Sequence, residues 1–122
     1  MESADDVLKI IASVKAFDRG ATTTYQLGHA AACVGAFDVS ETLFTQAVDA
    51  LRSEDRLHTL GTALVLLSWP ALHLGRWSAA VPAAEEGSRL CAETDQPFWH
   101  ACALAAHAAI AGRVGTSLRS AT

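Results

Sequence analysis

Three side chains with metal-binding or nucleophilic chemistry fall at related positions. His29 and Cys33 lie one helical turn apart, and His73 occupies the position equivalent to Cys33 one predicted repeat later. If these segments pack together, the thiolate of Cys33 lies near two imidazoles. Thiolate and imidazole are ligands that zinc prefers. A cysteine next to a histidine can also act as a Cys–His nucleophilic pair. No fourth ligand or orienting carboxylate accompanies them, and His and Cys on apolar faces are usually structural. We therefore assign no metal ligand and no catalytic residue, and keep a small Cys/His metal protein or enzyme as a distant alternative.

The other titratable residues form no second candidate site. His100, Cys102 and His107 share one predicted helix, but Cys102 lies on a different side of it from the two histidines. The sequence motifs of serine hydrolases, zinc peptidases and phosphate-binding loops are absent. We therefore expect no enzymatic activity and no cofactor.

The composition favours closely packed helices. Of the 122 residues 51% are hydrophobic, many of them alanine, and only 7% are aromatic. Alanine favours helix, whereas strands favour β-branched and aromatic residues. A chain of this length is expected to form a single domain over residues 1–122.

Charge and cysteine usage narrow the partners and the compartment. The net charge is −4 with no basic stripe, so no direct contact with nucleic acid is expected. Three cysteines without a CxxC motif suit a reducing compartment. The acidic start of the chain lacks the basic region of a signal peptide, and no apolar run is long enough to span a bilayer. We expect a cytoplasmic protein without a membrane partner.

Apolar spacing and helix-breaking residues predict six helices. Ser3, Asp38 and Ser78 are predicted N-caps, and Glu41 completes a capping box with Asp38. Pro70 is expected to kink the fourth helix. The predicted helices cover about residues 5–16, 21–34, 38–53, 57–74, 78–92 and 98–111.

A turn with glycine at a helix end and a large apolar residue two positions later occurs three times. The glycines are Gly35, Gly75 and Gly112, and the two intervals between them are similar in length. A period of this size is typical of stacked helical repeats. The predicted units cover about residues 21–56, 57–97 and an incomplete 98–122, after a leading helix in residues 1–20.

The residues of the first unit carry a family resemblance. Leu27-Gly28, followed by Gly35, Phe37, Phe44 and Ala47, resembles the tetratricopeptide repeat. The small positions of that repeat are filled by Gly28, Ser68, Ala105, Ser40, Ala80, Ala47 and Gly87. Over about residues 21–115 the long, alanine-rich repeats resemble the helical-repeat sensor region of actinobacterial LuxR-type, MalT-like transcriptional regulators. The chain has neither the phosphate-binding loop nor the helix-turn-helix of those regulators.

The resemblance implies an all-α, tetratricopeptide-like solenoid of antiparallel helix hairpins with about six helices. In such arrays the first helix of each unit lines a groove. Carried over by position, the groove residues are Tyr25, His29, Cys33, Val65, Trp69, His73, Trp99 and Cys102. Helical spacing independently places the first three on one face and the next three on another. These side chains either line an apolar, aromatic groove or pack against a neighbouring helix.

The predicted function is a non-enzymatic protein-interaction or scaffold module, part of or derived from the sensor region of a transcriptional regulator. Its expected partner is a protein or peptide. The main alternative is a small-molecule-binding protein that holds a hydrophobic ligand in the aromatic groove.

Neither end of the predicted array resembles a polar cap. The first helix has apolar residues with little to cover them, and the last is alanine-rich almost all round. Since solenoids need polar caps, we expect the chain to form a homo-oligomer or to be part of a longer protein.

Overall fold

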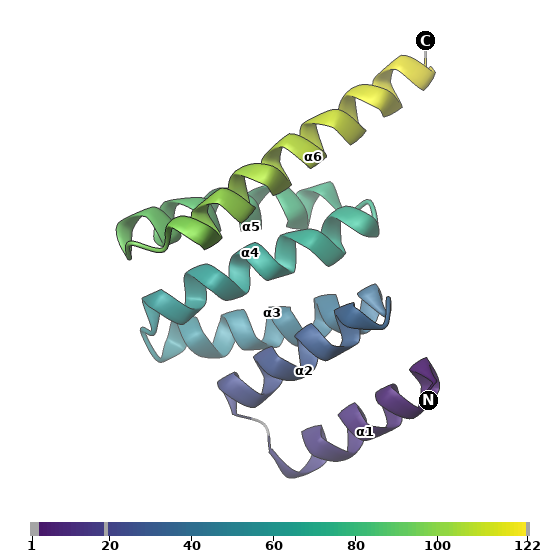
Figure 1. Cartoon of the computed structure of the whole chain (residues 1–122), viewed down its shortest axis with the longest axis vertical. Coiled ribbons are helices and arrows are strands. Elements are labelled where there is room, and N and C mark those ends of the chain that lie inside the picture. The colour runs from purple at the N-terminus through teal and green to yellow at the C-terminus, as the bar shows by residue number, and fades with distance from the viewer. Residues whose placement is uncertain (1–2, 19, 122) are drawn as a thin grey trace.

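The computed structural model describes residues 3–18 and 20–121, with side chains described as far as residue 113. These residues form six helices and no strand, which confirms the predicted all-α fold (Figure 1). The helices are α1 (Ala4–Phe17), α2 (Ala21–Cys33), α3 (Phe37–Ser53), α4 (Leu57–His73), α5 (Trp77–Glu93) and α6 (Pro97–Ala121).

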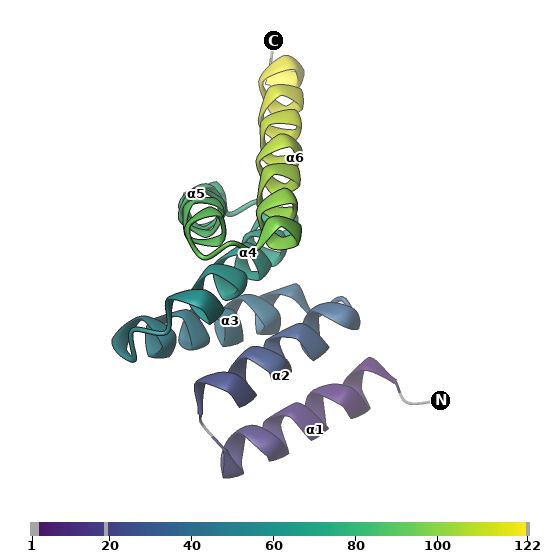
Figure 2. The same ribbon diagram turned by 60° about the vertical axis from the view of Figure 1, so that its left-hand side comes forward.

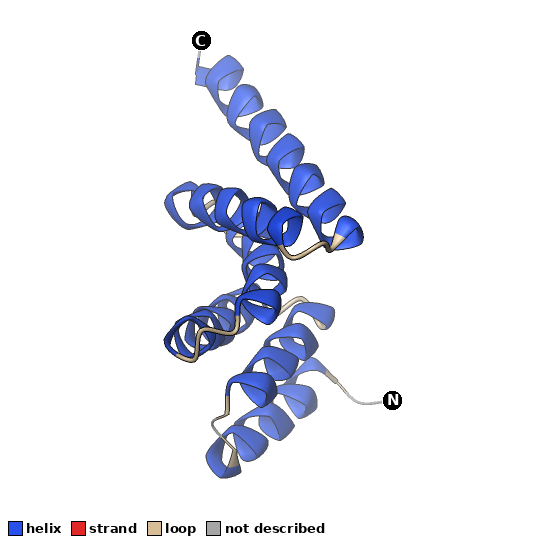
Figure 3. Ribbon diagram, turned by 90° about the vertical axis from the view of Figure 1, so that its left-hand side faces the viewer, coloured by secondary structure: helices blue, strands red, loops and turns tan. Residues whose placement is uncertain are grey.

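The helices are stacked as antiparallel hairpins. α2 pairs with α3 and α4 pairs with α5, while α1 lies on α2 and α6 lies on both α5 and α4. Figure 3 shows the helices following one another along the stack, with α1 and α6 at opposite ends. The helix-hairpin array expected from the sequence is therefore the observed architecture.

The turns from α2 to α6 are all built in the same way. The last residue of each turn donates its backbone N–H to the carbonyl of the residue five positions earlier, as Ala36 N does to Ala31 O at 3.0 Å. This bond satisfies one of the last carbonyls of the helix and requires a left-handed residue in the turn. The left-handed residues are evenly spaced along the chain: Gly35 (φ 79°), Asp55 (57°), Gly75 (71°) and Asp95 (56°). One helix with its turn therefore spans the interval from one of these positions to the next, and one hairpin spans two such intervals, as from Gly35 to Gly75.

The predicted third turn at Gly112 is wrong. α6 continues through this residue as helix, and its bounds are Pro97 and Ala121. The physical reason is register, because the even spacing of the observed turns, continued beyond Gly75 and Asp95, leads to position 115. Gly112 is therefore three positions early for a turn of this kind.

The predicted helix caps are only partly correct. Ser3 does cap α1, and it forms a capping box with Asp6. The predicted caps of α3 and α5 are wrong, because Ala36 and Arg76 occupy the N-cap positions without side-chain capping bonds. Each tight turn fixes the start of the next helix, which leaves Asp38 and Ser78 inside it.

Small residues allow the two helices of a hairpin to approach closely. A Cβ at Gly28 would lie 3.0 Å from the ring of Phe44, and a Cβ at Gly87 would lie 3.1 Å from the backbone N of Val65. Ser68 is also buried, as the resemblance implies. The third small position is displaced, because Ala105 is exposed.

Polar side chains join successive hairpins at matching positions. Arg56, at the end of the α3–α4 turn, donates to Thr22 at 3.4 Å. One hairpin further on, Gln96 accepts from Thr62 at 3.0 Å. The same contact between units is thus made twice with different chemistry.

A second kind of polar link involves charged residues. Arg52 donates to both carboxylate oxygens of Glu86, at 2.7 and 2.8 Å, and so ties α3 to α5. The buried Glu41 bonds the exposed Arg76 through Oε1, while its Oε2 has no partner among the described residues. At the position equivalent to Glu41 in the next hairpin the chain has Val81, so this carboxylate is specific to one unit.

Substituting Gly87 by alanine should destabilise the protein. The added methyl meets the Val65 backbone, which cannot move aside as a side-chain tip can. The free-energy cost of this overpacking exceeds the gain in helix propensity from glycine to alanine. We expect the free energy of unfolding to fall by about 1–2 kcal/mol in a chemical denaturation. Gly112→Ala is the matched control, because its Cβ meets no atom within 4 Å. The control should gain about 0.5–1 kcal/mol, and equal effects of the two variants would contradict the close-approach argument.

Acidification should remove the contribution of the Arg52–Glu86 pair. The hydrogen bond from Arg52 lowers the pKa of Glu86 below its ordinary value of 4.5. A carboxyl whose pKa is lower in the folded state stabilises the fold above pH 4.5, and that stabilisation is lost as the pH falls through the folded-state pKa. Because Arg52 is half-exposed, Glu86→Gln should cost only about 0.5 kcal/mol at neutral pH. The difference between wild type and variant should vanish in acid, and a difference independent of pH would refute the assignment.

Candidate functional site

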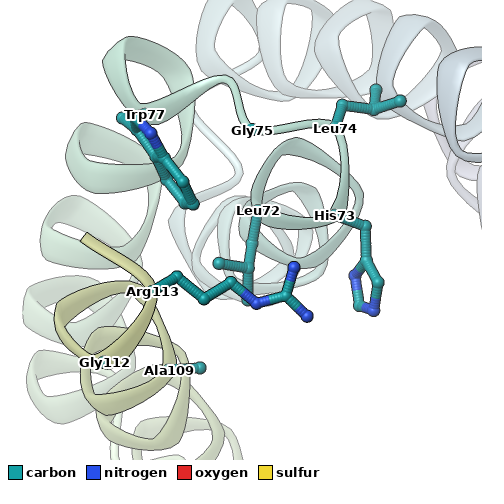
Figure 4. A pocket seen from close by; sticks show the side chains of 8 residues that line it. All are labelled: Leu72, His73, Leu74, Gly75, Trp77, Ala109, Gly112 and Arg113. Atoms are coloured by element: carbon teal, nitrogen blue, oxygen red, sulfur yellow. The ribbon is translucent and has the colours of Figure 1, made fainter. Parts of the chain in front are cut away.

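A groove lies where the end of α4, the α4–α5 turn and α6 meet. Its volume is about 750 Å³. Figure 4 shows the Arg113 side chain reaching from α6 toward the end of α4, with Trp77 on one side and His73 on the other. The lining residues are Leu72, His73, Leu74, Gly75, Trp77, Ala109, Gly112 and Arg113.

The hairpin repeat relates this groove to a closed contact in the preceding unit. There, the ring of Phe37 at the start of α3 stacks on His73, with centroids 4.5 Å apart and planes 19° apart. The residues at the equivalent positions one hairpin further on are Trp77 and Arg113, and both line the groove. The same two repeat positions thus hold an aromatic residue and a nitrogen-rich side chain at two levels of the stack, in contact at the first and lining a groove at the second.

The chemical groups of this groove suit binding. Its described lining offers apolar side chains, an indole, an imidazole and a guanidinium, and contains no carboxylate, thiol or hydroxyl group. The Nδ1 of His73 lies 2.8 Å from the carbonyl of Trp69 and therefore donates to it. Since that bond leaves only Nε2 of His73 for a ligand, the polar side-chain groups that can orient a bound group are the Arg113 guanidinium, this imidazole nitrogen and the Trp77 indole N–H.

A smaller groove of about 450 Å³ lies between α1 and α3. Leu8, Ile11 and Leu43 form its apolar floor, with Lys15 and Arg76 at its edge. Both cations already have partners, because Lys15 donates to Thr24 at 2.6 Å and Arg76 binds Glu41. The rest of its polar lining comes from Asp38 and Thr42, so unlike the α4–α6 groove it combines a carboxylate with cations that are already bonded within the protein.

The first predicted groove trio is divided between the core and the surface. Tyr25 is half-buried and lies edge-on to Phe44, with ring centroids 6.1 Å apart. Burial raises the pKa of this tyrosine. His29 and Cys33 are exposed on α2, and neither lines a groove described above.

The second trio also separates. Val65 is completely buried, so it packs in the core and lines no open groove. Trp69 is half-buried against the cluster that contains Ala71 and Ala106. His73 is exposed, and it is the predicted residue that lines the α4–α6 groove.

The third predicted pair lies in a small internal cluster. Trp99 and Cys102 of α6 pack against buried Val65, Cys91 and Ala103. Burial, and secondarily the neighbouring Cys102, raises the pKa of the Cys91 thiol. These two predicted residues join α6 to the α4–α5 hairpin.

The three potential metal ligands do not form a site together. Within the described part of the chain, no group of three or more His, Cys, Asp or Glu side chains is arranged to hold a metal ion. His73 is stacked on Phe37, whereas His29 and Cys33 lie on the surface of another helix. In the described residues these three side chains are therefore not grouped to hold a metal ion.

The sequence analysis does not identify Trp77 and Arg113 as residues that line a groove. The glycine pattern places both in turns, and the turn expected at Arg113 does not form. The sequence feature that could have identified them is their position, because Trp77 and Arg113 each lie one hairpin repeat after Phe37 and His73 respectively. With the correct period, both residues are recognisable as counterparts of a contacting pair.

Comparisons with known protein families, with curated proteins and with solved structures find no match to this chain. Among the residues that were searched, no helix is both long and apolar enough to cross a membrane.

The three cysteines should differ sharply in reactivity. Cys33 is exposed and Cys91 is buried with a raised pKa, so a thiol reagent at neutral pH should modify Cys33 first. Peptide mapping by mass spectrometry during labelling would follow each site. Cys33→Ser should remove the fast phase and Cys91→Ser should leave it. Rapid labelling of Cys91 in the folded protein would contradict its placement in the core.

Proposed function

We propose that this chain is a non-enzymatic protein-interaction module whose α4–α6 groove binds an apolar segment of a partner protein. The observation that carries the proposal is the composition of the groove. Trp77 and Leu74 provide apolar contact area beside the cation Arg113. Large aromatic and arginine side chains contribute most of the binding energy in protein interfaces.

The groove also indicates the chemistry of the partner. An apolar side chain fits between Trp77 and the end of α4, where it loses contact with water. A carboxylate next to it would accept hydrogen bonds from Arg113, whose planar guanidinium binds carboxylates in two-bond geometry. The preferred ligand is therefore a segment in which an apolar residue is flanked by an acidic one.

The small-molecule alternative is less well supported. Sites for small ligands enclose most of the ligand surface. Here, by contrast, His73, Leu74, Gly75, Gly112 and Arg113 are exposed along the lining. An open surface suits a segment of another protein better than an isolated small molecule.

We further propose a relationship to the tetratricopeptide-like sensor region of LuxR-type, MalT-like regulators, with a cytoplasmic location. The regular hairpin repeat and the small residues between its helices support this proposal. Its test is the reading frame around the gene, which should encode a nucleotide-binding or DNA-binding domain in the same polypeptide. An isolated frame without either domain would argue against it.

A selection from a displayed library of random peptides tests the proposed groove. Selected peptides should be rich in apolar residues next to Asp or Glu. Their affinity should fall at least about tenfold for Trp77→Ala or Arg113→Glu, since truncating interface anchors of these types typically costs about 2 kcal/mol or more.

Two controls make that experiment specific. Arg113→Lys keeps the charge and should retain part of the binding that Arg113→Glu removes. Leu57→Ala alters an exposed apolar residue at the far end of α4 and should bind normally. Peptides that bind wild type and Trp77→Ala equally would remove the groove as the binding site, and binding of small hydrophobic dyes alone would favour the small-molecule alternative.

A further inference from the structure

A buried carboxylate of α3 bonds the turn that forms one wall of the α4–α6 groove. Glu41 is only 7% exposed, and its Oε1 accepts a hydrogen bond from the guanidinium of Arg76. Arg76 lies between Gly75 and Trp77 in the chain, and both of these neighbours line the groove. Since the backbone fixes the separation of consecutive residues, a contact that holds Arg76 also restricts the position of Trp77.

The same part of α3 makes a second contact with this wall. Phe37 lies one helical turn before Glu41, and its ring stacks on His73, which lines the groove at the end of α4. Figure 2 shows α3 on the opposite side of α4 from α6. Phe37 and Glu41 themselves do not line the groove. Both residues therefore contact its wall without forming part of the binding surface.

The backbone hydrogen bonds of the turn join it to the helices of its own hairpin. The N–H of Arg76 donates to the carbonyl of Ala71 in α4 at 2.9 Å, and the carbonyl of Arg76 accepts from the N–H of Ala80 in α5 at 2.9 Å. The backbone thus fixes the turn within the α4–α5 hairpin. Glu41 adds a polar link from this turn to the preceding α2–α3 hairpin.

This ion pair is not arranged to add much stability to the fold. Burial removes water from Glu41, and its Oε2 has no partner among the described residues. The side chain of Arg76 remains 56% exposed, so solvent screens the attraction between the two charges. One hairpin further on, the position of Glu41 holds Val81, which is half-buried against an apolar cluster. The repeat therefore accepts an apolar side chain at this position.

We infer that Glu41 is a positioning residue of the α4–α6 groove, which holds Arg76 and thereby keeps Trp77 in its place on the groove wall. A wall that is ordered before the partner arrives loses less conformational freedom on binding. Without the bond, only a fraction of the molecules presents the wall correctly, and the apparent affinity falls by that fraction. The effect on affinity rests on the proposed function of the groove, whereas the effect on Trp77 does not.

Glu41→Val tests the inference, because the chain itself has valine at the equivalent position of the next hairpin. Its denaturation midpoint should stay close to that of wild type, since the exposed Arg76 regains water when the bond is lost. Trp77 is followed by its fluorescence in a background with Trp69→Phe and Trp99→Phe, where acrylamide should quench it faster once Glu41 is replaced. The affinity for a selected peptide should fall roughly threefold to tenfold, as expected if about a tenth to a third of the molecules keep the wall in place.

Two further variants show whether the effect belongs to this bond. Glu86→Val removes the Arg52–Glu86 pair, which also joins α3 to the α4–α5 hairpin but starts from the other end of α3, and it should leave quenching and affinity unchanged. Adding Arg76→Gln to Glu41→Val should cause no further loss, because Glu41 acts through Arg76. Glu41→Gln keeps the shape of the side chain and replaces Glu41→Val if the latter does not fold. If the phenylalanine background does not fold, faster amide hydrogen exchange of Arg76 reports the loosened turn instead.

The two readouts separate this inference from the proposed function. Faster quenching of Trp77 in a folded Glu41→Val, with Glu86→Val unaffected, supports the positioning role. If wild type then binds no peptide, that result contradicts the proposed function alone. Quenching that Glu41→Val leaves unchanged overturns the inference, whatever the protein binds. An equal effect of Glu86→Val, or a peptide affinity that stays at the wild-type value while Trp77 is loosened, would also overturn it.

Discussion

The structure depends on one repeated constraint, the left-handed turn that closes each helix. A residue with positive φ lets the following N–H bond a carbonyl in the last turn of the helix, and the chain reverses within a few residues. Gly35 and Gly75 adopt this conformation at no steric cost, while Asp55 and Asp95 are tolerated there. Because the turns are evenly spaced, equivalent side chains recur once in every hairpin. The contacts between hairpins follow from that spacing.

Much of the fold is predictable, because alanine content, helical spacing and two of the glycine turns all indicate the same architecture. The register of the last unit is not. Gly112 has the residue type of a turn, but it lies three positions out of phase, and residue type alone does not reveal phase. Asp55 and Asp95 resemble ordinary loop residues in the sequence, although they occupy the left-handed turn positions at the same even spacing as Gly35 and Gly75. With all four turns aligned, the position of the last helix follows.

The candidate site is less predictable, since helical spacing shows which residues share a face but not what that face meets. Val65, Trp69 and His73 do follow helical spacing, yet the first is in the core, the second half-buried and the third in the groove. Whether a face is covered depends on the neighbouring helix. On α4, Gly61, Leu64, Ser68 and Ala71 are buried, because α5 covers this face. The equivalent residues of α6 have similar small or apolar side chains but are exposed. They are Ala101, Leu104, Ala108 and Ala111. The surfaces available for binding therefore arise where the repeat is interrupted.

Among the described residues, no helix covers the face of α6 that carries Ala101, Leu104, Ala108 and Ala111. The thermal unfolding of a chimera tests most directly whether this face can receive a second helix. In the chimera, residues 116–122 are replaced by a copy of residues 76–93, so that Gly115 takes the place that Gly75 has before α5. The added helix should fold back on α6, raise the melting temperature by several degrees, and protect Leu104 from solvent. An unchanged melting temperature with a disordered added segment would contradict this assignment of the open face.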